Sequence, residues 1–93
     1  MRYTDEQLAG IKEYAAALTP IKDMAALLGV NANELRQDIA DIQNPVSAVY
    51  RKAKAETKLL LRKQEIELAK VGSPLAVQLT SSYTLSMEDD EDL

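Results

Sequence analysis

Apolar residues recur at helical spacing through most of this chain, and the pattern predicts helices throughout. Residues three and four apart are apolar across about 4–18, 20–28, 31–44, 45–71 and 74–87, and such residues share one face of an α-helix. No stretch alternates between apolar and polar residues as a half-buried strand does. The expected fold class is therefore all-α, with five helices.

Capping signals predict where these helices begin. Each proline follows a residue that favours the helix N-cap, in the pairs Thr19-Pro20, Asn44-Pro45 and Ser73-Pro74. A cap followed by proline at the first helical position satisfies one backbone amide and removes another. Thr4 with Gln7, and Asn31 with Glu34, have the spacing of a capping box. Gly29 can end a helix in the left-handed conformation.

Residues 1–44 are expected to form a compact head of three helices. Its core is predicted from the apolar faces of those helices: Leu8, Ile11, Ala15, Leu18, Ile21, Met24, Ala25, Leu28, Leu35, Ile39 and Ile42. The second and third helices are short, the turn between them holds Gly29, and the small Ala25 lies where they would cross. These features are typical of a helix-turn-helix.

The helix expected over residues 45–71 is too long for a head of this size to cover. It contains no Gly or Pro, and about 27 residues at 1.5 Å rise give roughly 40 Å. Its apolar residues fall on two faces, which predicts two sets of neighbours. We expect an antiparallel hairpin over residues 45–87 that assembles several copies of the chain. The side chains expected at that interface are Val49, Ala53, Leu59, Leu60, Ile66, Leu75, Leu79 and Tyr83.

The charge pattern adds a basic middle segment and an acidic end. The net charge is −4, but residues 45–87 hold seven basic and three acidic groups, whereas residues 88–93 hold five acidic groups and no basic one. A basic segment is suited to phosphate, to an acidic patch of another copy, or to the chain's own tail. We expect residues 88–93 to be a disordered acidic tail.

Composition argues against catalysis. The chain has no His and no Cys, which removes the usual general base, any disulfide and any thiolate zinc site. No Gly-rich phosphate loop is present. We therefore expect no catalytic residue, no metal and no cofactor. No apolar run approaches the roughly 20 residues that span a bilayer, so a cytoplasmic protein without membrane contact is expected.

The third predicted helix carries residue types that contact DNA bases. The second helix of a helix-turn-helix places its exposed N-terminal residues in the major groove, and here these are Asn31, Asn33, Arg36 and Gln37. Asn and Gln can pair with adenine, and Arg with guanine. Lys22 is suited to a phosphate contact. Residues 20–44, which hold both helices, contain more acidic than basic groups. We therefore expect one copy to bind double-stranded DNA weakly and tethered copies to bind more tightly.

In this head and in the segment Ala69-Lys70-Val71-Gly72-Ser73-Pro74-Leu75-Ala76, the chain resembles small terminase subunits of tailed bacteriophages. Many of those have a helix-turn-helix head, a long helix, a similar break and a returning helix. The resemblance covers most of residues 4–87. The small β-rich barrel that follows the hairpin in many members has no counterpart here.

That family resemblance implies specific roles. The head would bind viral packaging-site DNA through Asn33, Arg36 and Gln37, in the cytoplasm of a bacterial host. The hairpin would build a ring of roughly eight to ten subunits, a number that belongs to the family and not to helix geometry. The C-terminal tail would bind the large terminase subunit, which is the ATPase and nuclease.

Two other functions stay open from the sequence. One is a dimeric helix-turn-helix transcription regulator whose last two helices form the dimer interface. The other is a helical protein–protein adaptor that does not bind DNA. The number of subunits separates the ring from the dimer, and salt-dependent DNA binding separates both from the adaptor.

Overall fold

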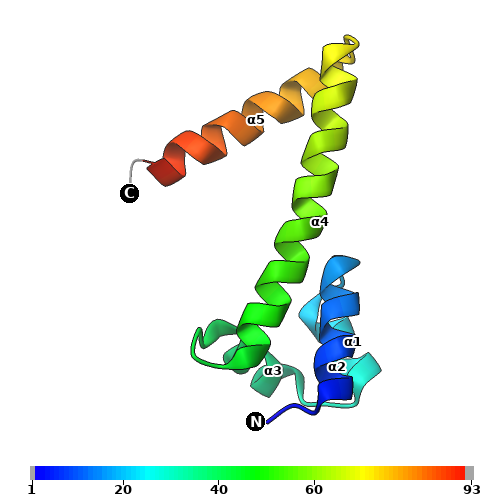
Figure 1. The fold of residues 1–93 in the computed structure, drawn as a ribbon, viewed down its shortest axis with the longest axis vertical. Helices are drawn as coiled ribbons and strands as arrows, with labels where there is room; N and C mark the ends of the chain where they lie inside the picture. Colours follow the sequence, from blue (N-terminus) through cyan, green and yellow to red (C-terminus); the bar gives the residue numbers. More distant parts are fainter. Residues whose placement is uncertain (1, 92–93) are drawn as a thin grey trace. The chain divides into compact units, whose positions relative to one another are not determined.

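The computed structural model describes residues 2–91, which form five α-helices without a strand (Figure 1). The helices are α1 (Asp5–Ala16), α2 (Ile21–Leu28), α3 (Ala32–Ala40), α4 (Pro45–Lys70) and α5 (Pro74–Glu91). The all-α class expected from the sequence is confirmed. The chain divides into two compact units, which we call the N-terminal unit (residues 1–57) and the C-terminal unit (residues 58–93). The first half of α4 therefore belongs to the same unit as the three short helices, whereas the sequence pattern predicts a boundary at residue 44.

Capping bonds fix most of the helix starts as expected. Thr4 and Gln7 form a complete capping box at the start of α1. The Asn31 side chain accepts from the Glu34 amide at the start of α3, at 3.0 Å. Asn44 accepts from the amide of Val46 at 3.1 Å. Each bond satisfies an amide that has no partner within its own helix.

Two other helix boundaries, the start of α5 and the end of α2, also follow local signals, whereas the start of α2 differs from the prediction. Ser73 caps the start of α5 by accepting from the Ala76 amide at 3.4 Å, and Gly29 ends α2 with φ of +72°. Thr19 was expected to cap α2, but Pro20 occupies the N-cap position with extended backbone and no side-chain bond. The proline thus lies one position earlier than its preferred place inside a helix.

The N-terminal unit is built around one apolar core to which all of its helices contribute. The core side chains are Ile11 and Ala15 of α1, Met24 and Ala25 of α2, Leu35 and Ile39 of α3, and Val46 and Ala53 of α4. A Cβ atom at Gly10 would lie 2.9 Å from the Leu28 side chain, so the absent side chain lets α1 and α2 approach closely.

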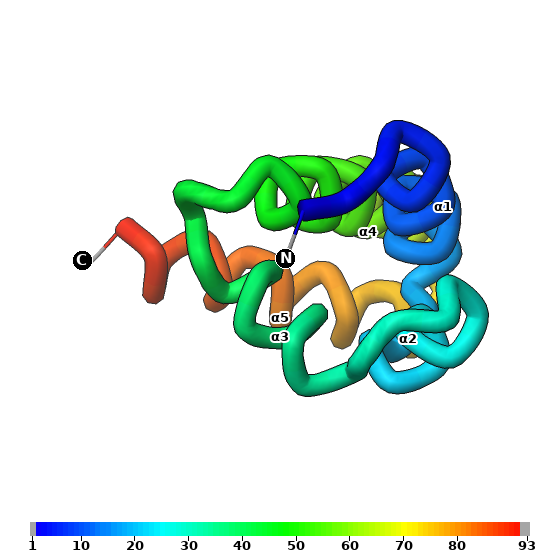
Figure 2. Tube along the Cα trace, turned by 90° about the horizontal axis from the view of Figure 1, so that it is seen from below, coloured from blue at the N-terminus to red at the C-terminus, as the bar shows by residue number. Residues whose placement is uncertain are grey.

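The first half of α4 runs beside α1 in the N-terminal unit (Figures 1 and 2). At the far end of this contact, the Thr57 hydroxyl donates to the Ala16 carbonyl at 2.6 Å, which satisfies a carbonyl at the end of α1. Leu18 and Ile42, expected in the core, are instead exposed. Both follow the last residue of a helix, since α1 ends at Ala16 and α3 at Ala40, so the helical spacing no longer directs them inward.

The C-terminal unit holds the second half of α4, the turn at Gly72 and α5. Gly72 has φ of +93°, a conformation that glycine adopts without steric cost. In Figure 1, α5 diverges from the second half of α4 with increasing distance from this turn. Helix α5 continues to Glu91, so the expected disorder is wrong for residues 88–91, while residues 92–93 lie outside the described residues. Glu is a good helix former, and no Gly or Pro follows Met87 to end the helix.

Candidate functional site

Helix α3 carries three of the predicted DNA-contacting side chains on its exposed surface. Asn33, Arg36 and Gln37 are all exposed, and their spacing places them on neighbouring positions of one helical face. A guanidinium nitrogen of Arg36 donates to the Asn33 side-chain oxygen at 3.1 Å. These three residues therefore form one polar cluster, which is available to a ligand of this unit.

The other two predicted DNA contacts have different surroundings. The Asn31 side chain holds the start of α3 by accepting from the Glu34 amide, so its oxygen already has a structural role. Lys22 is exposed in the first turn of α2. Within residues 2–91 its ammonium forms no ion pair, as a phosphate contact would need.

A hydrogen bond missed from the sequence ties α3 to the N-terminal segment. The Tyr3 hydroxyl donates to a carboxylate oxygen of Asp38 at 2.6 Å. Burial of the ring, followed by this bond and the nearby Asp38 charge, raises the pKa of Tyr3 above its ordinary value. No sequence signal points to this pair, because the two residues lie 35 positions apart. The bond anchors the helix whose outer face carries the polar cluster.

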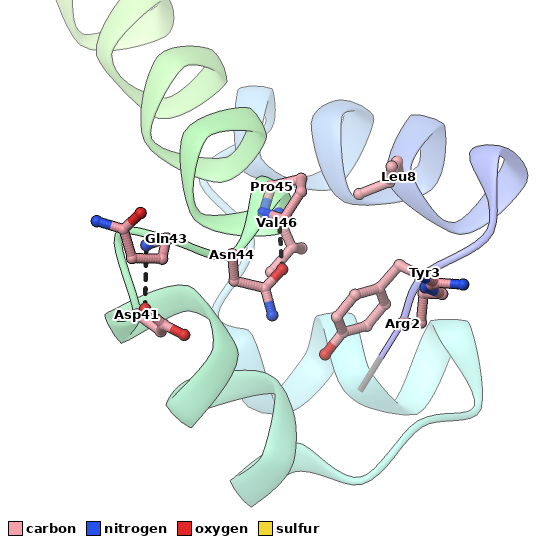
Figure 3. A pocket seen from close by; sticks show the side chains of 8 residues that line it. All are labelled: Arg2, Tyr3, Leu8, Asp41, Gln43, Asn44, Pro45 and Val46. Atoms are coloured by element: carbon pink, nitrogen blue, oxygen red, sulfur yellow. Dashed lines mark hydrogen bonds between the residues drawn. The ribbon is translucent and has the colours of Figure 1, made fainter.

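An open pocket of about 410 Å³ lies beside Tyr3 and the start of α4 (Figure 3). The polar groups around it serve the local backbone: Asp41 accepts from the Gln43 amide at 3.0 Å, and Asn44 caps α4. Figure 3 shows the Tyr3 ring in this pocket and Leu8 on the neighbouring helix. The pocket thus brings together Arg2, the Tyr3 ring, capping groups and apolar side chains.

The C-terminal unit leaves large apolar side chains uncovered. Ala76 is its only buried residue among those described. Four of the predicted interface residues are exposed, namely Leu59, Leu60, Ile66 and Leu75, whereas Leu79 and Tyr83 are half-buried. Exposed apolar side chains in such number are typical of a surface that contacts a partner.

Two predicted interface residues belong elsewhere. Ala53 is buried in the core of the N-terminal unit, and Val49 packs against that core. Both belong to the N-terminal unit. The Ala53 side chain is covered by the same chain, whereas Val49 stays half-buried. Small and β-branched residues fit either setting, so the pattern alone could not assign them.

Further exposed apolar residues extend this surface beyond the prediction. They are Leu61, Leu68, Val71, Val77, Leu85 and Met87. The triplet of leucines at residues 59–61 was the available signal, because three consecutive helical positions cannot all face one neighbour. Leu60, Leu61 and Leu68 lie toward one side of α4, while Leu59 and Ile66 line a groove with α5.

That groove lies between the second half of α4 and α5 and has a volume of about 530 Å³. Its α4 side is lined by Leu59, Arg62, Lys63 and Ile66, and its α5 side by Tyr83, Ser86, Met87 and Asp90. The Arg62 guanidinium lies 5.2 Å from the centre of the Tyr83 ring, within the range of a cation–π interaction. The groove therefore combines an apolar floor with two cations and one carboxylate.

None of the helices in residues 2–91 is both long and apolar enough to cross a membrane. Within the same residues, no cluster of acidic side chains has the arrangement needed to hold a metal ion. No protein-family model matches this chain, and comparison with curated proteins and with solved structures gave no match.

Proposed function

We propose that this chain is a non-catalytic DNA-binding adaptor that assembles into a ring, in the manner of the phage small terminase subunits it resembles. In this proposal α2 and α3 form a helix-turn-helix, and the second half of α4 forms a hairpin with α5 that joins the subunits. The ring would recognise viral DNA for packaging and recruit the large terminase subunit through the C-terminal segment.

One observation carries the assembly part of the proposal. The C-terminal unit buries only Ala76 among its described residues while many leucine side chains stay exposed. A helix pair with so little buried surface is marginal on its own, because most helical stability in proteins comes from packing of an apolar face. Neighbouring copies of the chain would supply that packing.

The surfaces of this unit also favour a ring over a twofold dimer. Leu60 and Leu68 lie on a different side of α4 from Leu59 and Ile66, which line the groove. A twofold interface uses the same patch on both subunits, whereas two unlike patches suit head-to-tail association, which closes into a ring when the rotation allows.

The DNA-binding part of the proposal is supported by the polar cluster on α3. Asn33, Arg36 and Gln37 are exposed together and are the residue types that pair with base edges. Residues 20–44, which contain α2 and α3, hold only two basic groups, Arg36 itself and the predicted phosphate contact Lys22. Affinity would therefore depend on several units acting together.

Two measurements on the full chain test the proposal. Native mass spectrometry should give a closed oligomer of many subunits, and binding to duplex DNA should weaken steeply with salt. Arg36→Ala with Gln37→Ala should reduce DNA affinity by about tenfold or more, since one bidentate base contact contributes about 1–3 kcal/mol. The oligomer should be unchanged.

A matched control removes the same residue types from other exposed positions, Arg51→Ala with Gln78→Ala. It should bind DNA much as the wild-type chain does. A dimer would favour the transcription-regulator alternative, and an oligomer that ignores duplex DNA at low salt would favour the protein–protein adaptor. Equal affinity of the α3 variant and its control would refute the assignment of the DNA contact to α3.

A further inference from the structure

The groove of the C-terminal unit has an apolar floor edged by cations. Leu59 is 52% exposed and Ile66 is 41% exposed, so both present apolar surface to a ligand. Arg62 and Lys63 line the same groove and are exposed. Asp90 is the one acidic lining residue, so the groove is net basic. It suits a helix with an apolar side chain next to carboxylates.

The opposite face of α5 has that composition. Leu85, Glu88 and Asp89 are spaced as i, i+3 and i+4, which places them on one face of the helix. All three are exposed, with Leu85 at 59%. They stand away from the face that lines the groove through Tyr83, Met87 and Asp90. We call the Leu85, Glu88 and Asp89 side chains the donor face.

The donor face and the groove of one chain cannot meet. The groove is formed in part by the inner face of the same helix, so the outer face of that helix points away from it. Among residues 2–91 no ion pair joins α4 to α5; the ion pairs within α4 are Lys52 with Glu56 and Glu67 with Lys70. Among the same residues no carboxylate forms an ion pair with Arg62 or Lys63, although the Arg62 guanidinium lies over the Tyr83 ring.

We propose that the donor face of one copy docks in the groove of a second copy. Leu85 would lie between Leu59 and Ile66, and the Glu88 and Asp89 carboxylates would face the cations Arg62 and Lys63. Complementary charge across an interface fixes register and excludes wrong partners. Glu88 and Asp89 of the C-terminal segment are thus assigned to the assembly itself, and not to recruitment of the large terminase subunit.

This inference rests on the self-association in the proposed function and specifies its contact. Donor and acceptor are different surfaces, so each copy offers one of each and the contact repeats from subunit to subunit. Assembly should also be salt-sensitive, because the ionic part of the contact lies at a partly exposed rim.

Charge reversal tests the contact. The donor variant carries Glu88→Lys with Asp89→Lys, and the groove variant carries Arg62→Glu with Lys63→Glu. Each alone should raise the concentration for half-assembly by about tenfold or more, because attraction becomes repulsion. Sedimentation velocity measures this. Lysines in the last turn of α5 favour its helix, so circular dichroism should show undiminished helicity in the donor variant.

Mixing the two variants gives the sharpest outcome. The lysine donor face of the first variant then meets the glutamate groove of the second. The acidic donor face of the second variant meets the basic groove of the first, as in the wild-type chain. Both contacts are complementary, so assembly should return. The control Glu13→Lys with Glu56→Lys changes net charge equally but lies in the N-terminal unit, and it should assemble normally.

The outcomes separate this inference from the proposed function. A wild-type chain that stays monomeric at high micromolar concentration overturns both. A wild-type oligomer whose assembly is unaffected by either charge reversal, or whose disrupted variants fail to rescue each other, overturns the docking contact alone and leaves ring formation in place.

Discussion

Replacing Tyr3 by Phe tests how the N-terminal segment holds α3. The substitution keeps the ring and removes only the hydroxyl that donates to Asp38 at 2.6 Å. A hydrogen bond to a charged group contributes about 1.5–3 kcal/mol when buried, and Tyr3 is only half-buried. We expect a loss of about 1–2 kcal/mol in the free energy of unfolding, or roughly 4–16 °C in Tm for a chain of this size.

The pH dependence of stability gives a second measure of the same bond. The pKa of Tyr3 is raised in the folded chain, by burial first and by Asp38 next, so the folded state keeps a proton that the unfolded state loses near pH 10. The contribution is complete below pH 10 and is lost as pH rises further. Tyr3→Phe should lack this part of the alkaline loss.

Chemical denaturation followed by circular dichroism measures both effects, at a fixed protein concentration because the proposed assembly would also stabilise the folded chain. Tyr14→Phe is the matched control, since Tyr14 is also half-buried and packs against the same core without a hydrogen bond from its hydroxyl among residues 2–91. Equal stability of the two variants, with parallel alkaline profiles, would refute the reasoning.

Three further predictions concern single positions. The Ser47 hydroxyl is fully buried and has no hydrogen-bond partner among residues 2–91, so Ser47→Ala should stabilise the chain by about 1 kcal/mol in denaturation; a loss of stability would show that the hydroxyl is bonded in solution. Gly29→Ala should cost about 1–2 kcal/mol because φ is +72° with open space around the Cβ position, and Gly29→Asn should cost less; equal costs would point to packing instead. Leu60 is 57% exposed, so Leu60→Asp should leave the subunit folded and abolish assembly by burying a charge, and an oligomer of unchanged mass would place Leu60 outside the interface.

Sequence patterns predicted the features of this fold that depend on a few neighbouring residues. The capping box of Thr4 and Gln7, the cap by Asn44 and the left-handed Gly29 follow from side chains that bond or relax their own backbone. The face formed by Ile11 and Ala15 was also visible, since both lie inside an uninterrupted helix.

The features that were missed depend on contacts between distant segments. Ala53 was predicted at the interface between copies, yet it lies in the core with residues of α1–α3. An amphipathic pattern shows which face of a helix is apolar, but not which helix covers that face. The bond between Tyr3 and Asp38 is equally invisible in the sequence. Among the candidate site residues, exposure of Asn33 and Arg36 could be foreseen from their helical positions, but their mutual hydrogen bond could not.

The thin packing around Ala76 has a consequence for the life of the protein in a cell. Segments with few buried contacts open most easily, and an opened helix is what a protease cleaves. In the proposed assembly, a copy without neighbours would be cut first between residues 58 and 91, whereas an incorporated copy would survive. Turnover would then remove surplus subunits and hold the supply of this chain to the number that its complexes can accept.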